Sequence, residues 1–190
     1  MTDSPTDQHG KRERLVEGAC RAVHEHGVEG TTLADIAAVA DVPVGNVYYY
    51  FKTKDELIEA AIGARAQEIK ARLADLERLR TPRARLKALT AWWSELGEQV
   101  ARHGCPHGTL CAELNKRNGG LDRKAAQLLE LSVDWAEQQF ALMGRRDARD
   151  LAIELIARFQ GTALLTNTFR DPALMSRQSR RTERWIESLA

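Results

Sequence analysis

The sequence predicts an all-α protein of about nine helices, in which a small N-terminal helix-turn-helix domain precedes a larger helical domain. Apolar residues recur at helical spacing along most of the 190 residues, and no segment alternates apolar and polar residues for long enough to indicate a half-buried strand. Threonine, aspartate, proline and glycine stand where helices begin and end. With 43% hydrophobic and 29% charged residues, the composition is that of a globular protein with a buried core.

The first helix is expected to follow a polar segment, residues 1–10, which we predict to be a disordered arm. Leu15, Ala19 and Val23 recur on one helical face, which predicts an amphipathic helix packed on a core. Gly27 stands where a left-handed C-cap costs least, so we expect the helix to end there.

Two short helices are predicted next. Thr32, followed three residues later by Asp35, forms a capping box of the Asp variety and predicts a second helix over about residues 33–40. Asp41 tolerates a left-handed turn and Pro43 suits a first helical turn. The third helix is therefore expected over residues 44–51.

The remaining helices are predicted from similar signals. A capping box at residues 53–56 begins a fourth helix that ends near residue 79, and Thr81-Pro82 begins a fifth over about residues 82–102. A break containing Gly104, Pro106 and Gly108 precedes a short sixth helix, which ends at Gly119-Gly120. The last three predicted helices span residues 121–143, 147–168 and 172–189.

The distribution of charge is more informative than its total. Residues 1–60 contain six Lys and Arg against eleven Asp and Glu, although the whole chain has a net charge of +1. Total charge therefore gives no sign of a nucleic-acid-binding domain. Because phosphate neutralisation is local, the clusters at residues 11–14 and 52–54 are the bases most useful for DNA binding.

The residues of the third predicted helix favour a DNA-reading role. Gly45 removes a side chain at the leading end of the helix, and Asn46 offers both a donor and an acceptor. Tyr48, Tyr49 and Tyr50 cannot all face a core, because consecutive helical residues point about 100° apart. At least one tyrosine hydroxyl must then meet solvent or phosphate.

Residues 31–57, TTLADIAAVADVPVGNVYYYFKTKDEL, resemble the signature segment of the TetR/AcrR family of transcriptional repressors. The likeness covers the apolar skeleton, Gly45, the pair Tyr48 and Tyr49, and Lys54. It implies that Thr32 and the amides near it bind one phosphate and that residues 43–46 enter the major groove. The residues for which the resemblance implies DNA contact are Thr32, Pro43, Val44, Gly45, Asn46, Tyr48, Tyr49, Tyr50 and Lys54.

Two residues depart from the family pattern. Asp41 stands where the family usually has glycine, and Val44 where it often has a polar residue. Val44 cannot hydrogen-bond to a base edge, so specificity at this position is expected from a thymine methyl group or from DNA shape. The operator sequence does not follow from these residues.

For the second half of the chain the resemblance implies a ligand pocket and a dimer. We expect residues 11–56 to form the DNA-binding domain and residues 57–190 to form the ligand-binding and dimerisation domain. The broad apolar faces of helices 121–143 and 147–168 are expected to form a four-helix bundle with a second copy. The alternative is that both helices pack wholly within one subunit.

Aromatic and sulfur-containing residues mark the expected pocket. Adjacent tryptophans at 92 and 93 point to different sides of a helix, so one of them either lines a cavity or belongs to the core. The candidate ligand-binding residues are Trp92, Trp93, Cys105, His107, Cys111, Trp135 and Phe159. A small hydrophobic or aromatic effector fits this set.

The segment around Cys105 has residues for two other kinds of chemistry. A thiol near a histidine and a helix N-terminus is expected to have a lowered pKa, so Cys105 or Cys111 could sense oxidants or electrophiles. Cys111 also lies four residues after His107, but the spacing around Pro106 is irregular for a metal site. We therefore expect buried thiols most of all, and no metal or cofactor.

Several classes of protein are disfavoured. The sequence has no phosphate loop, serine elbow or paired carboxylates, so we expect no enzyme. The arginines of the last predicted helix, from Arg177 to Arg184, are expected to form a solvated face. The polar N-terminus and the absence of long apolar runs predict a cytoplasmic protein with no membrane span.

The combined prediction is a homodimeric repressor that binds a palindromic operator and is released from it by an effector. The alternative from another class is a helical small-molecule-binding protein without DNA recognition.

Overall fold

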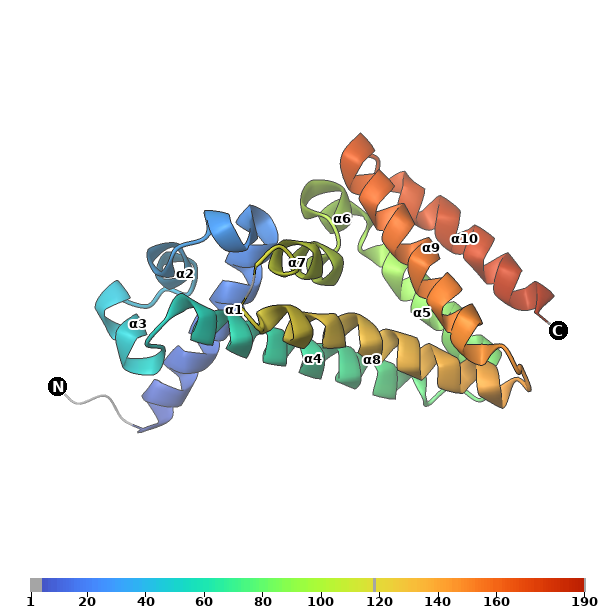
Figure 1. Ribbon diagram of the computed structural model, residues 1–190, viewed down its shortest axis with the longest axis horizontal. Coiled ribbons are helices and arrows are strands. Elements are labelled where there is room, and N and C mark those ends of the chain that lie inside the picture. Colours follow the sequence, from blue (N-terminus) through green and yellow to red (C-terminus); the bar gives the residue numbers. More distant parts are fainter. Residues whose placement is uncertain (1–4, 118, 190) are drawn as a thin grey trace. The chain divides into compact units, whose positions relative to one another are not determined.

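A computed structural model describes residues 5–117 and 119–189, and within those residues the chain forms ten helices and no strand (Figure 1). The chain divides into two compact units. The first unit contains the residues up to Gln67 together with Thr109–Ala126, and the second contains Glu68–Gly108 with the residues from Gln127 onward. The all-α fold class predicted from the sequence is confirmed.

The first unit is built on α1 (Pro5–Gly30), α2 (Leu33–Val39), α3 (Val44–Tyr50) and the beginning of α4 (Lys54–Leu76). Its core contains Leu15, Ile36, Val47 and Leu57, one from each helix and all fully buried. Gly18 allows α2 to pack closely on α1, since a Cβ atom there would lie 3.1 Å from the Ile36 carbonyl oxygen. One small core therefore fixes all four helices.

The caps and turns of this unit follow the sequence prediction. The Thr32–Asp35 capping box is present, and Asp41 has a φ of 51°, the left-handed conformation expected at that turn. Gly27 also has a left-handed φ of 76°. The helical path is kinked there and resumes as far as Gly30.

The start of α4 differs slightly from an ordinary capping box. The amide of Glu56 donates to Thr53 Oγ1 at 3.1 Å, as predicted. The carboxylate of Glu56 accepts from the amide of Lys52 at 2.7 Å, one residue before the expected donor. Both bonds hold the loop between α3 and α4 in place.

The second unit contains α5 (Pro82–Glu95), α6 (Gly97–His103), α9 (Ala148–Phe169), α10 (Ala173–Ser188) and most of α8 (Leu121–Leu142). Helix α7 (Pro106–Leu114) has residues in both units. In Figure 1, α10 runs beside α9, and α10 packs against both α5 and α9. Leu89, Leu155 and Ile186 are fully buried on these three helices. These residues form the core of the second unit.

The prediction of one helix over residues 82–102 was wrong in detail. The chain forms α5 and α6, separated by a turn at Leu96. Gly97 begins α6 in close contact with Pro172, since a Cβ atom at Gly97 would lie 2.8 Å from the Pro172 carbonyl oxygen. The break is thus associated with a tertiary contact that helical periodicity does not reveal.

Two boundaries differ from those expected. Helix α1 begins at Pro5, inside the segment predicted as an arm, while residues 1–4 lie outside the described residues. The compact unit that contains the helix-turn-helix also includes Thr109–Ala126, a segment that falls in the predicted second domain, residues 57–190. The division into DNA-binding and ligand-binding functions stays a prediction.

Candidate DNA-binding site

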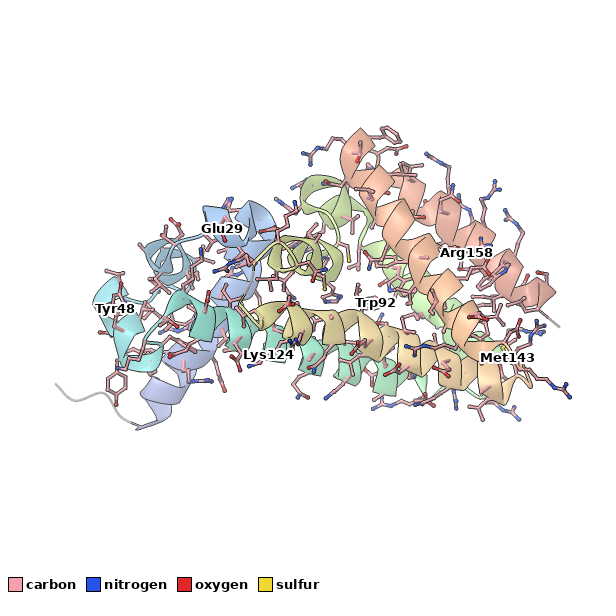
Figure 2. All side chains as sticks on the ribbon, in the orientation of Figure 1. Glu29, Tyr48, Trp92, Lys124, Met143 and Arg158 are labelled. Carbon is pink, nitrogen blue, oxygen red and sulfur yellow. The ribbon has the colours of Figure 1, made fainter. Side chains whose placement is uncertain are left out.

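Helix α3 presents large apolar and aromatic side chains to solvent. Val47 is fully buried and fixes α3 on the core, whereas Val44, Tyr48 and Tyr49 are 50%, 56% and 66% exposed. Figure 2 labels Tyr48 on this helix. A short helix anchored on one face and exposed on the other has the form of a recognition helix.

The three consecutive tyrosines divide as helical geometry requires. Tyr50 is half-buried against the core, and its ring lies edge-on to Tyr49 with centroids 5.0 Å apart. Tyr48 and Tyr49 are the two whose rings are largely exposed. The expectation that at least one tyrosine faces outward is confirmed, and DNA contacts by the three tyrosines stay predictions.

The leading end of α3 is open. A Cβ atom at Gly45 would meet nothing within 4 Å, so the packing of this chain does not require glycine at that position. Pro43 is the N-cap, and its carbonyl accepts from the amide of half-buried Asn46 at 2.8 Å. A glycine with space around it suits close approach by DNA.

The N-terminus of α2 is occupied by a carboxylate. The amide and hydroxyl of Thr32 donate to Asp35 Oδ2 at 2.8 and 2.7 Å, and the amide of Asp35 donates back to Thr32 Oγ1 at 3.1 Å. These bonds with Thr32 lower the pKa of Asp35. A phosphate that approached Thr32 would meet this charge, so phosphate binding at Thr32 stays a prediction.

Basic side chains hold the recognition helix and its surroundings. Lys52 Nζ donates to the Tyr48 carbonyl oxygen at 2.8 Å, at the C-terminal end of α3. The guanidinium of Arg12 lies 5.2 Å from the centre of the Phe51 ring. Arg21 Nη2 donates to the Val39 carbonyl oxygen at 2.9 Å and so satisfies an acceptor at the end of α2. Arg21 was not among the sequence candidates, because no local motif connects it with α2.

Two of the candidate pocket residues are in contact in the second unit. Trp93 and Phe159 stack with ring centroids 4.3 Å apart and an interplanar angle of 23°. Trp93 is buried, and the cavity beside the pair has a volume of only about 10 Å³. That volume is about the least that holds one water molecule, so the stacked pair forms part of the core.

Trp92 and Trp135 have separate polar partners. The guanidinium of Arg72 lies 5.2 Å from the centre of the half-buried Trp92 ring. Trp135 Nε1 donates to Glu77 Oε1 at 2.6 Å, and Glu77 also pairs with Arg85 at 2.9 Å. The structure does not bring either tryptophan into the Trp93–Phe159 stack.

The thiols do not have the environment expected of reactive cysteines. Cys105 Sγ accepts from the amide of Gly108 at 3.4 Å and from Gln160 Nε2 at 3.5 Å. Burial nevertheless raises the pKa of the Cys105 thiol, so the lowered pKa of the sensor alternative is wrong and the expected buried thiol is found. Cys111 is also buried, belongs to the first unit, and donates to the Ala125 carbonyl oxygen at 3.2 Å. Desolvation of the thiolate therefore outweighs the neighbouring donors at Cys105.

His107 and Cys111 both lie in α7, four residues apart as expected. His107 is half-buried and belongs to the second unit, unlike Cys111. Among the described residues, no group of three or more His, Cys, Asp or Glu side chains has a metal-binding arrangement. Within the same part of the chain, no helix has the length and apolarity required to cross a bilayer.

The fold and the exposed helix α3 together define a helix-turn-helix DNA-binding domain. Residues 15–61 match the family described as "Bacterial regulatory proteins, tetR family". The chain therefore contains an N-terminal domain of this family of bacterial regulatory proteins.

Relatives of this class match along most of the chain. An uncharacterised HTH-type transcriptional regulator of Lactococcus lactis is 29% identical over 166 residues, which cover 84% of this chain and 85% of the relative. The HTH-type transcriptional regulator TtgR of Pseudomonas putida is 27% identical, with 79% and 77% covered. A TetR transcriptional regulator from Chloroflexus aurantiacus has the same fold, with a TM-score of 0.83, 22% identity and 96% of both chains covered. These relatives are named as regulators, not as enzymes.

Proposed function

We propose that the protein is a homodimeric repressor that binds a palindromic operator and releases it when a small hydrophobic or aromatic effector binds. The observation that carries this proposal is the exposure of Val44, Tyr48 and Tyr49 on a helix fixed by the buried Val47. Two such helices related by a dimer axis fit successive major grooves of one DNA face. The protein then acts in the cytoplasm, where its operator lies.

The outer face of α9 supports the homodimer. Ile153, Leu164, Leu165 and Phe169 are 50%, 66%, 48% and 65% exposed. They lie on one side of the helix, with the small, exposed Ala157 and Gly161 between them. A stripe of large apolar side chains around small residues suits close packing against another helix. We propose that α9, together with α8 over the predicted range 121–143, forms the interface with a second copy.

A groove beside this stripe is consistent with the same interface. It has a volume of about 310 Å³, lies between α9 and α10, and is lined by Gly161, Leu165 and Leu174 among others. Because Gly161 and Leu165 also belong to the α9 stripe, a second copy that covers the stripe also covers part of the groove. The groove is therefore not our candidate for the effector site.

The effector proposal rests on the aromatic content of the second unit. Trp92, with Arg72 over its ring, combines a flat apolar surface with a cation and is only half-buried. That combination suits an aromatic or weakly acidic small molecule. Within the second unit we retain Trp92, Cys105, His107 and Trp135 as candidates, and no cofactor is proposed. Ligand contacts by Trp93 and Phe159, which stack in the core, and by Cys111, which lies in the first unit, stay predictions from the sequence.

DNA binding is tested by selection of duplexes from a random library with the purified full-length chain, followed by gel shifts with the DNA upstream of its own gene. We expect enrichment of an inverted repeat that the upstream DNA also contains. A chain that selects no sequence, and shifts specific and random duplexes equally, would be a helical ligand-binding protein without DNA recognition.

The dimer is tested by gel filtration coupled to light scattering. We expect a mass twice that of the 21.3 kDa chain.

A further inference from the structure

Two side chains far along the sequence contact the segments that flank the helix-turn-helix. Glu113 is the penultimate residue of α7, and Arg117 follows the same helix by three residues. Both belong to the first unit, together with α1, α2 and α3. Neither was identified from the sequence, since the residues they contact are more than sixty positions away.

Glu113 binds the backbone at the kink in α1. Its Oε2 accepts from the amide of Val28 at 2.6 Å. The positive φ of Gly27 takes the chain out of the helical path there, so the next amide needs an acceptor outside the helix. A Cβ atom at Gly27 would lie 2.9 Å from the same carboxylate oxygen. The positive φ favours glycine at the kink, and a Cβ atom there would also displace the Glu113 carboxylate from its position.

The kink leads directly to the beginning of α2. The hydroxyl of buried Thr31 lies 2.7 Å from the Gly27 carbonyl oxygen and 3.2 Å from that of Ala22. Thr32, the next residue, is the N-cap of α2. The position of the Gly27–Val28 backbone therefore sets the position of the first helix of the helix-turn-helix.

Arg117 bridges the two ends of the same motif. Its Nε lies 3.2 Å from Glu29 Oε1, and its Nη2 lies 3.2 Å from Asp55 Oδ1. Glu29, labelled in Figure 2, follows Val28 in the segment before α2, and Asp55 is the second residue of α4, after α3. A further ion pair joins Lys124 of α8 to Glu59 of α4. The contacts from α7 and the beginning of α8 thus hold both flanks of α2–α3.

We propose that Glu113 and Arg117 are positioning residues for DNA binding, which set the affinity of the helix-turn-helix without touching DNA. The inference rests on the proposed function only in taking DNA binding as the activity measured. Glu113 supplies the acceptor for the Val28 amide, and Arg117 bridges Glu29 and Asp55, so the loss of either side chain releases a flank of α2–α3.

The first experiment compares Glu113→Ala and Glu113→Gln with the wild-type chain on a duplex selected by the wild-type chain. We expect Glu113→Ala to weaken binding about tenfold, because the buried Val28 amide loses its charged acceptor. Glu113→Gln should recover most of that affinity, since its amide oxygen can still accept. The salt dependence should stay unchanged in both variants, because no phosphate contact is removed. Wild-type affinity in Glu113→Ala, or a changed salt slope, would overturn the inference.

The second experiment uses Arg117→Gln, with Lys116→Gln as the matched control. Both remove one positive charge from the same turn, but Arg117 bridges Glu29 and Asp55 while Lys116 is an exposed neighbour. We expect weakened binding only in Arg117→Gln, accompanied by faster hydrogen exchange in residues 28–35 of the DNA-free protein. Equal loss in both variants would mean that general electrostatics is responsible, and would overturn the positioning role.

The exchange measurement separates this inference from the proposed function. If the wild-type chain selects no duplex, the proposed function fails, but faster exchange in residues 28–35 of Arg117→Gln and Glu113→Ala still supports the positioning contacts. If the wild-type chain binds DNA while both variants bind equally well and exchange at the wild-type rate, the inference alone fails. Glu113→Gln and Arg117→Gln keep the test valid if Glu113→Ala does not fold.

Discussion

The carboxylate of Asp35 accepts hydrogen bonds from both the amide and the hydroxyl of Thr32, at 2.8 and 2.7 Å. The two residues thereby close the N-terminus of α2, the helix that supports the recognition helix α3. The same bonds, with the side chain of Thr32 contributing most, lower the pKa of Asp35. The start of the helix-turn-helix is therefore stabilised by an ionised carboxylate.

A pH-dependent contribution to stability follows from this cap. Since the folded pKa of Asp35 lies below its unfolded value, the contribution is fully present above the ordinary pKa of about 4 and is lost as the pH falls through the lowered value. Asp35→Ala should therefore be less stable than wild type at pH 7, and the difference should shrink toward pH 3. Urea unfolding followed by circular dichroism at several pH values measures it. A difference that stays constant down to pH 3 would contradict the role of the charge.

Lys54 and Tyr48 are expected to contribute to DNA binding in different ways. Lys54→Ala should weaken binding to every sequence and reduce the slope of log affinity against log salt by about one, because one phosphate-bound cation is lost. Tyr48→Phe should weaken binding to every sequence but leave the slope unchanged, because the hydroxyl is neutral. Fluorescence anisotropy at several salt concentrations measures both effects. Wild-type affinity in both variants would count against the assigned contacts.

Val44 is expected to contact a thymine methyl group. It is 50% exposed and cannot form a hydrogen bond with a base edge. Replacing each thymine of a selected half-site in turn by uracil removes only the methyl group and should weaken wild-type binding about fourfold at one position, as expected for about 0.8 kcal/mol per buried carbon. Val44→Ala should lose this sensitivity while Tyr48→Phe retains it. Equal affinity for every uracil-substituted duplex would instead favour specificity through DNA shape.

The sequence predicted those features of the fold that depend on neighbouring residues. The Thr32–Asp35 cap, the left-handed Asp41 and the Thr81 cap of α5 each require a side chain only a few positions away, and all three are present. Helical periodicity did not predict the break at Gly97, which accompanies a contact with Pro172, distant in the sequence. Amphipathic patterns carry no information on such pairings.

In the candidate site, too, features set by nearby residues were predicted and contacts between distant residues were not. The exposure of Tyr48 follows from helical geometry and from the resemblance, whereas the bond from Val28 to Glu113 spans 85 positions. The one local signal for that bond is Gly27, which indicates a departure from helix but not the partner that the next amide finds. The buried Cys105 expected from the sequence is found, whereas the lowered pKa of the sensor alternative is not, because burial raises the pKa of this thiol.

Burial should make Cys105 slow to react. Its raised pKa keeps the thiol protonated in the folded protein, so any stability that this contributes is present below the ordinary thiol pKa and is lost as the pH rises through the folded value. Alkylation by iodoacetamide at pH 8, followed by mass spectrometry, should be at least about tenfold slower in the native protein than in urea. Hydrogen peroxide should leave DNA binding unchanged. Fast native alkylation, or peroxide-induced release that Cys105→Ser abolishes, would restore the thiol-sensor hypothesis.

The apolar stripe on α9 gives a direct test of the dimer. Leu164 is 66% exposed, and a charge at its position would have to be buried in the proposed interface. Leu164→Glu is therefore expected to convert the protein to a monomer, while its helical content remains unchanged because the side chain touches little of its own subunit. Arg180→Glu, which places the same charge on the exposed face of α10, is the control and should remain dimeric. Gel filtration with light scattering distinguishes the two masses.

A monomeric Leu164→Glu should also lose affinity for the full inverted repeat far more than for a single half-site, since only a dimer links the two binding events. A Leu164→Glu protein that stays dimeric would place the interface on another face.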